Sequence, residues 1–150
     1  MKKFLLLILV ITGCGSNGLD ESAKMIATAS SEVDGRGGYF AVDGDSDTFW
    51  CVDEIENTIP VLTVILPEEK SLKNVTFMPG PKEFGRPNIV EVWYDSQAEA
   101  LGELHFTDTD GEQSFEMPED AVTAVKFKFM RSFAGTYGNA QTCVAEIDFD

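Results

Sequence analysis

The chain has 150 residues, and its 26 acidic residues against 11 Lys and Arg give a formal net charge of −15. This excess of acid excludes most nucleic-acid-binding functions, because those functions depend on basic patches that contact phosphates. Aromatic residues make up 11% of the chain, so it has enough apolar surface for a core and is not expected to be disordered. The length fits one domain.

The N-terminus is predicted to be an export signal. Lys2 and Lys3 precede the apolar run 4–11, which is too short to cross a membrane, since a spanning helix needs about 20 residues. The residues Ile11-Thr-Gly-Cys14 resemble the lipobox of bacterial lipoproteins. The resemblance implies cleavage after residue 13 and a diacylglycerol group on Cys14. The alternative is an ordinary secretory signal with an incidental cysteine.

Residues 14–24 are predicted to form the lipidated end of the mature chain and a flexible tether. A ten-residue coil of this polar composition has an r.m.s. reach of about 17 Å. Gly15, rather than Asp, follows Cys14, which favours the outer membrane if the bacterial envelope has two membranes. Loss of Lys2 and Lys3 leaves 9 basic and 26 acidic residues, a net charge of −17.

The segment 41–50, AVDGDSDTFW, concentrates oxygen-bearing side chains around a glycine. Acid and glycine clusters favour turns, because Asp and Gly tolerate unusual backbone angles. Oxygen ligands also suit Ca²⁺, which takes about 6–8 of them. We therefore expect a turn here that a cation could stabilise, with Trp50 anchoring it to the core.

An EF-hand loop is the competing interpretation of the same segment. Asp43, Asp45, Asp47 and Glu54 fall at its first, third, fifth and twelfth positions. However, the sixth position needs glycine for a sharp turn and is occupied by Thr48. The glycine-rich sequence upstream also disfavours an entering helix, so we reject the EF-hand.

Two cysteines remain once Cys14 is assigned to lipid. An exported protein meets an oxidising compartment, so Cys51 and Cys143 are expected to form a disulfide. Two buried free thiols are the alternative, since some anaerobic bacteria leave exported thiols reduced.

The rest of the chain shows period-2 alternation and short apolar runs rather than a helical period. About eight short strands predict an antiparallel sandwich or barrel over residues 25–150. The turn signal Asp108-Thr-Asp-Gly111 predicts a hairpin between the strands on either side of it. The clearest strands are expected at 60–67, 72–78, 89–94, 101–106, 113–117, 125–129 and 142–149.

Three stretches carry a family resemblance: Ala29-Ser-Ser31, segment 41–50, and Val144-Ala-Glu-Ile147. They resemble the discoidin domain, also called the coagulation factor 5/8 type C domain, over residues 25–150. The resemblance implies an all-β, antiparallel jelly-roll sandwich of the galactose-binding-like type. The ending 135–149 is also similar to a bacterial branch named after the translocation domain of a streptococcal NAD glycohydrolase toxin.

The resemblance also implies a structural Ca²⁺ where the Asp-Gly loop meets the last strand. The implied ligands supply about seven oxygens and join segments far apart in the chain, where loop closure is entropically costly. A metal-free turn, with Asp side chains capping backbone amides, is the alternative. The implied ligand set is Phe40, Asp43, Asp45, Thr48, Ala145 and Glu146.

Recognition is expected in loops at one end of the barrel, as in the family that the chain resembles. Aromatic faces and polar donors in such loops suit an open carbohydrate site. The expected partner is a glycan, and the alternative is an envelope protein or a purely structural role. Each of these side chains could equally be a solvated or covering residue. The candidates are Tyr39, Phe84, Arg86, Asn88, Tyr137 and Asn139.

We expect no enzymatic activity and a monomer. His105 is the only histidine, and its place in an alternating strand predicts solvent exposure. The sequence holds no nucleophile elbow, zinc-binding histidine pair or phosphate loop. The expected function is that of a glycan-binding lipoprotein of the bacterial cell envelope.

Overall fold

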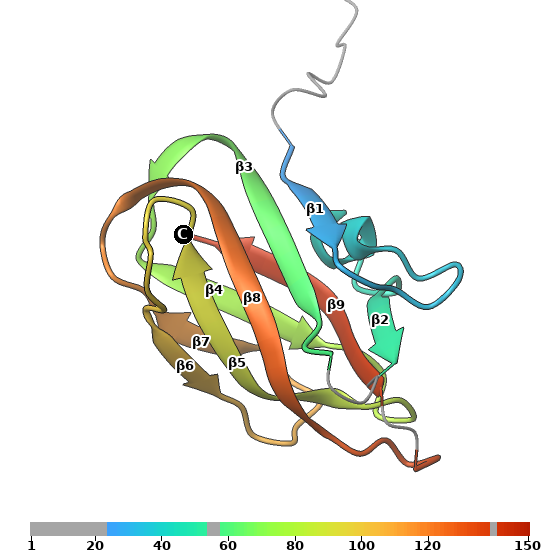
Figure 1. The fold of residues 1–150 in the computed structure, drawn as a ribbon. Helices are drawn as coiled ribbons and strands as arrows, with labels where there is room; N and C mark the ends of the chain where they lie inside the picture. The colour runs from blue at the N-terminus through green and yellow to red at the C-terminus, as the bar shows by residue number, and fades with distance from the viewer. Residues whose placement is uncertain (1–23, 54–57, 139–140) are drawn as a thin grey trace, which may run out of the picture.

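The computed structural model of the chain describes residues 24–53, 58–138 and 141–150. The predicted signal peptide, Cys14 and Asn139 lie outside the described residues. In the described part, nine strands form two antiparallel sheets that face each other (Figure 1). The prediction of an all-β antiparallel sandwich is confirmed, with nine strands in place of about eight.

The two sheets differ in size and are called sheet A and sheet B. Sheet A has the strand order β1-β3-β8-β5-β6, and sheet B has the order β2-β9-β4-β7. A short 3-10 helix, η2, lies between the first two strands in the chain. The bounds are β1 Ile26–Ala29, η2 Gly38–Val42, β2 Trp50–Asp53, β3 Val61–Ser71, β4 Asn74–Pro79, β5 Arg86–Tyr94, β6 Gly102–His105, β7 Gln113–Glu116, β8 Ala121–Phe133 and β9 Gln141–Phe149.

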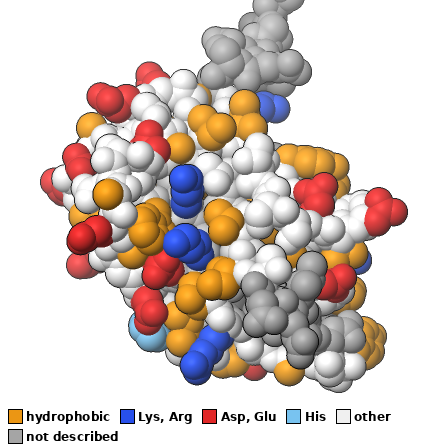
Figure 2. Space-filling view, viewed as in Figure 1, with side chains coloured by type: hydrophobic (Ala, Val, Ile, Leu, Met, Phe, Trp, Pro, Cys, Tyr) orange, Lys and Arg blue, Asp and Glu red, His pale blue; other side chains and the backbone are white. Residues whose placement is uncertain are grey.

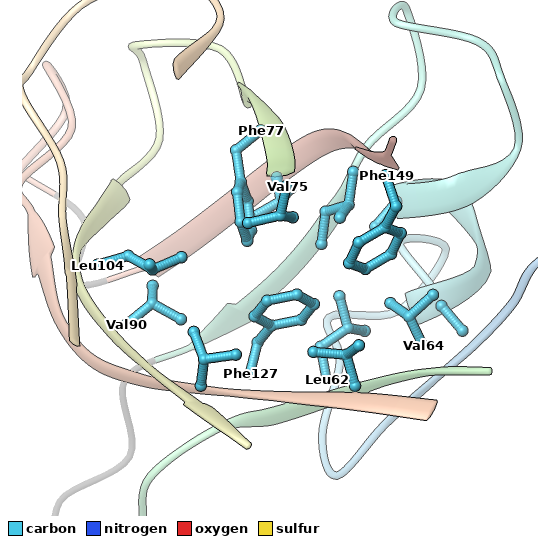
Figure 3. Packing of buried hydrophobic residues seen from close by; sticks show 14 of the residues in the cluster. Leu62, Val64, Val75, Phe77, Val90, Leu104, Phe127 and Phe149 are labelled. Carbon is cyan, nitrogen blue, oxygen red and sulfur yellow. The ribbon is translucent and has the colours of Figure 1, made fainter. Parts of the chain in front are cut away.

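The core lies between the sheets and follows from the period-2 alternation of the strands. In β3, Leu62 and Val64 are fully buried while Ile65 is exposed. Phe77 of β4 and Phe127 of β8 both point into the core (Figure 3). The Phe77 ring is edge-on to the rings of Phe106 and Phe127, at centroid distances of 5.1 Å. Such edge-to-face pairs add stability beyond the area that they bury.

Strand bounds differ from the prediction at the start of the chain and around Pro67. The strands β1 and β2 were not predicted. The strand β3 does not end at Pro67 but continues to Ser71, with an irregularity in its pairing to β8 between Ile65 and Lys70. Pro67 is tolerated there because the β3–β8 pairing is interrupted between Ile65 and Lys70, where no backbone N–H is needed for a ladder hydrogen bond.

The predicted hairpin around 108–111 is wrong. The strand before it, β6, belongs to sheet A, and the strand after it, β7, belongs to sheet B. The segment 106–112 therefore crosses from sheet A to sheet B. An Asp-Gly turn signal is local, so it shows that the chain turns but not which strand it pairs with next.

Within the described residues, no helix is long and apolar enough to span a bilayer. The loop between η2 and β2 contains the Asp-Gly segment, and it lies against β9, because η2 packs on that strand. This places the two halves of the predicted metal site side by side.

Candidate functional site

The Asp-Gly loop, defined as residues 43–48, folds back on itself after η2. Gly44 has φ of +81°, a left-handed conformation that glycine adopts without strain. The carboxylate of Asp43 accepts hydrogen bonds from the Asp45 N–H at 2.9 Å and from the Thr48 hydroxyl at 2.8 Å. These bonds gather the oxygens of the loop around its inner side.

The oxygens are crowded in a way that suits a cation. Thr48 Oγ1 lies 2.8 Å from Asp43 Oδ2 and 2.9 Å from the carbonyl oxygen of Asp45. The single hydroxyl proton is shared between these two acceptors. The carboxylate, hydroxyl and carbonyl oxygens are the ligand types that Ca²⁺ prefers.

Glu146 of β9 completes this group from the far end of the chain. Its Oε2 accepts a hydrogen bond from the Gly44 N–H at 3.1 Å. Burial raises the pKa of the Glu146 carboxyl to about 7, and the negative charges of Asp43, Asp148 and Asp45 add to the rise, while the Gly44 bond opposes it. The negative charge at this position is therefore poorly compensated by the protein alone.

These residues fit a Ca²⁺ site built largely from carbonyl and hydroxyl oxygens. The described residues contain no group of three or more His, Cys, Asp or Glu side chains close enough to hold a metal ion. Such a site therefore needs the Thr48 hydroxyl and the Asp45 carbonyl. Phe40 lies in η2 and Ala145 precedes Glu146 in β9, so both implied carbonyl donors lie on the two elements that meet here. The ligand set stays a prediction.

The strand after the loop excludes the EF-hand interpretation. Residues 50–53 form strand β2 rather than the start of an exiting helix. Beside the loop, Cys51 of β2 lies directly opposite Cys143 of β9, and a disulfide joins them. Both residues are fully buried. The expected covalent pair thus connects the same two segments as the proposed metal ligands.

Three loops bring an arginine and two phenylalanines together at one end of the sandwich. The Arg36 guanidinium lies over the Phe49 ring at 3.9 Å and over the Phe84 ring at 4.8 Å from their centroids. The two rings are 5.7 Å apart. We call these three residues the Arg36 cluster. Of the three, only Phe84 was predicted as a ligand-binding residue.

The loop that contains Phe84 is paired with the loop after β8. Thr136 donates its N–H to the Lys82 carbonyl at 3.0 Å, and Tyr137 donates to the Glu83 carbonyl at 3.4 Å. A Cβ on Gly135 would lie 2.3 Å from the Phe84 backbone, so only glycine permits this approach. Tyr137 is 71% exposed. Phe84 and Tyr137 therefore lie on neighbouring loops, as expected.

Arg86 does not face the open loops. Its guanidinium is paired with the carboxylates of Asp108 and Asp110 and donates to the Thr109 carbonyl. Only 11% of its side chain is exposed. These contacts hold the crossing segment against β5, so we leave Arg86 out of the ligand site.

Asn88 and Tyr39 contact residues other than those of the Arg36 cluster. Asn88 borders a hollow of about 320 Å³ together with Ile59, Met130 and neighbouring residues. Tyr39 is 57% exposed on η2, and its ring packs on Phe40 at 4.1 Å. The role of each in binding stays a prediction that these contacts do not support.

A hollow of about 480 Å³ adjoins the Asp-Gly loop rather than the Arg36 cluster. Its polar lining is mostly acidic, from Asp43, Glu112, Glu146 and Asp148, and it lacks an aromatic side chain. A sugar site needs a flat apolar face for stacking, so we favour the Arg36 cluster over the larger hollow.

The fold resembles solved carbohydrate-binding modules. One, the third family 32 module of a family 31 glycoside hydrolase from Clostridium perfringens, has a TM-score of 0.73 at 19% identity, over 85% of this chain and 91% of that one. A second, the family 32 module of Clostridium perfringens NanJ in complex with galactose, has a TM-score of 0.71 at 16% identity, over 85% and 94%.

A third similar structure is the F5/8 type C domain of a Bacteroides fragilis protein, with a TM-score of 0.65 at 18% identity, over 87% of this chain and 93% of that one. No protein-family profile matches the chain, and no curated protein matches it either. The similarity to the NAD glycohydrolase branch stays a prediction. The described residues thus have the galactose-binding-like sandwich fold of family 32 carbohydrate-binding modules and F5/8 type C domains.

Proposed function

We propose that this chain is a lipid-anchored, non-catalytic protein of the bacterial cell envelope that binds carbohydrate. The fold supports this, since solved modules with the same fold include one in complex with galactose. The observation that most favours binding is the Arg36 cluster, where two aromatic rings and a guanidinium from three loops meet.

The Arg36 cluster and the neighbouring Tyr137 together offer the two kinds of contact that hold a sugar. Tyr137, on the loop next to that of Phe84, gives an exposed aromatic ring that can stack on the C–H face of a pyranose. Stacking on Phe49 and Phe84 positions the Arg36 guanidinium, whose N–H groups would donate to the hydroxyl groups of a sugar. We assign Arg36, Phe84 and Tyr137 to the site.

Calorimetric titration with galactose, together with a glycan array, tests this function. We expect Tyr137→Ala and Arg36→Ala each to weaken binding by about 5- to 30-fold, since each removes a contact worth about 1–2 kcal/mol. Ile65→Ala, an exposed apolar change on sheet A, serves as the control and should leave affinity unchanged. If no glycan binds, the domain instead serves protein interaction or a structural role.

We also propose that Ca²⁺ occupies the Asp-Gly loop as a structural ion. A bound Ca²⁺ would neutralise the charges of Asp43 and Glu146. The hydrogen bond from the Gly44 N–H to Glu146 already holds the loop against β9. At a calcium concentration about 100 times Kd the gain is about 2.7 kcal/mol, which raises Tm by several degrees.

Thermal melts with EDTA and with added Ca²⁺ check this site. Asp43→Asn and Glu146→Gln should abolish the rise in Tm. Asp47→Asn is the matched control, because only the backbone N–H of Asp47 takes part in the loop's hydrogen bonds. An equal rise in Tm for all three variants would contradict the ligand set.

The proposed anchor is checked by mass spectrometry of the protein from the membrane fraction. We expect a diacylglyceryl mass at Cys14 and release of the Cys14→Ser variant into the soluble fraction. Size-exclusion chromatography of the released protein should show a monomer.

A further inference from the structure

The disulfide lies where two loops of the proposed glycan site are attached to sheet B. Cys51 of β2 pairs in register with Cys143 of β9, and their Cα atoms are 4.2 Å apart (Figure 1). In an antiparallel ladder this spacing is typical of a non-hydrogen-bonded pair, in which the backbone N–H and C=O groups of the two residues point away from each other. The backbone groups of each cysteine are therefore available to a different neighbour.

Cys51 uses both of its backbone groups to hold the turn that carries Arg36. Its carbonyl oxygen accepts a hydrogen bond from the Val33 N–H at 2.8 Å, and its N–H donates to the Arg36 carbonyl at 3.3 Å. The Arg36 N–H closes the turn by donating to the Val33 carbonyl at 2.9 Å. The Val33–Arg36 turn is thus attached to β2, the edge strand of sheet B.

Cys143 holds the loop that carries Phe84 in the same way. Its carbonyl oxygen accepts a hydrogen bond from the Gly80 N–H at 3.1 Å, and its N–H donates to the Gly85 carbonyl at 2.9 Å. A Cβ on Gly80 would lie 2.6 Å from the Cys143 Cβ, so the Gly80–Gly85 loop packs directly on this cysteine. Phe84 is next to Gly85 in the chain, so the position of its ring depends on this attachment.

The Arg36 cluster closes across this junction. The Arg36 guanidinium lies 4.8 Å from the Phe84 ring centroid, so a side chain of the turn contacts a side chain of the loop. Within the described residues, no backbone hydrogen bond joins the turn to the loop. Each is bonded instead to one cysteine, and the disulfide joins the two cysteines. The covalent bond therefore sets how far apart the backbones of the turn and the loop lie.

We propose that the disulfide positions the Arg36 cluster for its ligand, by fixing the distance between the turn that carries Arg36 and the loop that carries Phe84. This role rests on the proposed glycan-binding function. Side chains that are already ordered lose less conformational entropy when a ligand binds. Without the covalent bond, β2 is paired only with β9, through the hydrogen bonds of the residues around Cys51. The turn and the loop can then move apart, and ordering them on binding lowers the affinity by about tenfold.

Substitution tests this role more directly than chemical reduction does. Both cysteines are fully buried. Figure 2 shows most acidic side chains toward the rim of the visible face, and the chain's net charge of −15 repels thiolate reductants. The full-length Cys14→Ser protein is the reference, because Cys51 and Cys143 are then its only cysteines.

Two double variants of this reference remove the bond in different ways. Cys51→Ala with Cys143→Ala removes both the bond and packing volume, whereas Cys51→Val with Cys143→Ala removes the bond and keeps more of the volume. Leu72→Ala is the control for lost stability, since such a change in the core costs about as much as the loss of a disulfide. Leu72 is fully buried and precedes β4, whereas the loop of Phe84 follows β4, so the control lies at the other end of that strand.

Heteronuclear NMR of the arginine side chains observes the cluster without a ligand. Because the Arg36 guanidinium lies over two rings, ring currents should displace its Nε–H signal upfield in the reference protein. We expect this displacement to be lost in both disulfide variants and kept in Leu72→Ala. The indole N–H of Trp93, which donates to Glu91 on sheet A, should give the same signal in every variant. Folded and unfolded molecules give separate signals, so the comparison concerns folded molecules only.

Calorimetric titration with galactose relates the cluster to binding. We expect both disulfide variants to bind galactose about tenfold more weakly than the reference, and Leu72→Ala to bind it as the reference does. A reference protein that binds neither galactose nor any sugar of a glycan array contradicts the proposed function. The Arg36 signal still decides in that case whether the disulfide positions the cluster.

Four results would overturn this role of the disulfide. The first is an Arg36 signal that stays displaced in the folded Cys51→Ala with Cys143→Ala variant. The second is an unchanged affinity for galactose in the disulfide variants. Recovery of the signal and the affinity in Cys51→Val with Cys143→Ala would assign the effect to packing rather than to the bond. Failure of both disulfide variants to fold, while Leu72→Ala folds, would show that the bond serves the whole domain and not the cluster.

Discussion

Removal of the disulfide by Cys51→Ala with Cys143→Ala is expected to destabilise the domain strongly. The two residues are 92 positions apart in the chain. The chain-entropy relation for a loop of this length gives about 4.6 kcal/mol at 25 °C. The structure adds a second reason, because β9 is the only neighbour of β2 in sheet B. Since domains of this size are stable by about 5–15 kcal/mol, the loss is a large fraction of the total.

Urea unfolding followed by tryptophan fluorescence measures the effect. With a slope of about 2 kcal/mol per molar urea, the midpoint should fall by about 2.3 M. Reduced wild-type protein is the control and should unfold near the variant. A midpoint shift below about 0.5 M would refute the reasoning, because it would mean that the disulfide restricts the unfolded chain very little.

Three further outcomes depend on single contacts. In metal-free protein, folding raises the pKa of Glu146 from its ordinary value of 4.5 to about 7, so the folded state binds this proton more tightly than the unfolded state does. The free energy of unfolding should therefore decrease as the pH rises from 4.5 to 7. In melts with EDTA, Glu146→Gln should reduce this pH dependence. A Cβ on Gly85 would lie 1.5 Å from the Gln141 carbonyl oxygen, so Gly85→Ala should prevent folding by circular dichroism, while Gly111→Ala, with nothing within 4 Å, should melt as wild type. Arg86→Met leaves Asp108 and Asp110 without their partner and should cost about 1.5–3 kcal/mol in urea, against at most about 1 kcal/mol for the more exposed Lys128→Met.

The sandwich was predictable because most of its strands alternate between buried and exposed residues. The strands β1 and β2 have four residues each, and three consecutive buried residues in β2 hide any alternation. The strand β3 was predicted too short, because a proline is a reliable stop signal only where the ladder is regular. The hairpin at 108–111 was predicted wrongly for a related reason. The Asp-Gly turn signal depends on neighbouring residues, whereas the sheet that the next strand joins depends on residues far away in the sequence.

The local half of the proposed metal site was predicted from the acid and glycine cluster, and its far half, Ala145 and Glu146, only through the family resemblance. Asp43 and Glu146 are too far apart in sequence for any local pattern to connect them, and the Gly44–Glu146 bond spans 102 residues. The Arg36 cluster was missed for a similar reason, because its members come from three separate loops. Arg86 was misjudged because its partners, Asp108 and Asp110, lie in a segment that was predicted to belong to a hairpin.

The position of β9 has a consequence for how the protein is made. It follows every other strand in the sequence, yet it lies inside sheet B between β2 and β4. During synthesis, β2 therefore has no partner strand, and Glu146 cannot reach the Asp-Gly loop, until the last of these strands has emerged from the ribosome. Contacts of such long sequence separation also form slowly. If the chain is exported as proposed above, this late strand would delay completion of sheet B until the whole domain has left the ribosome.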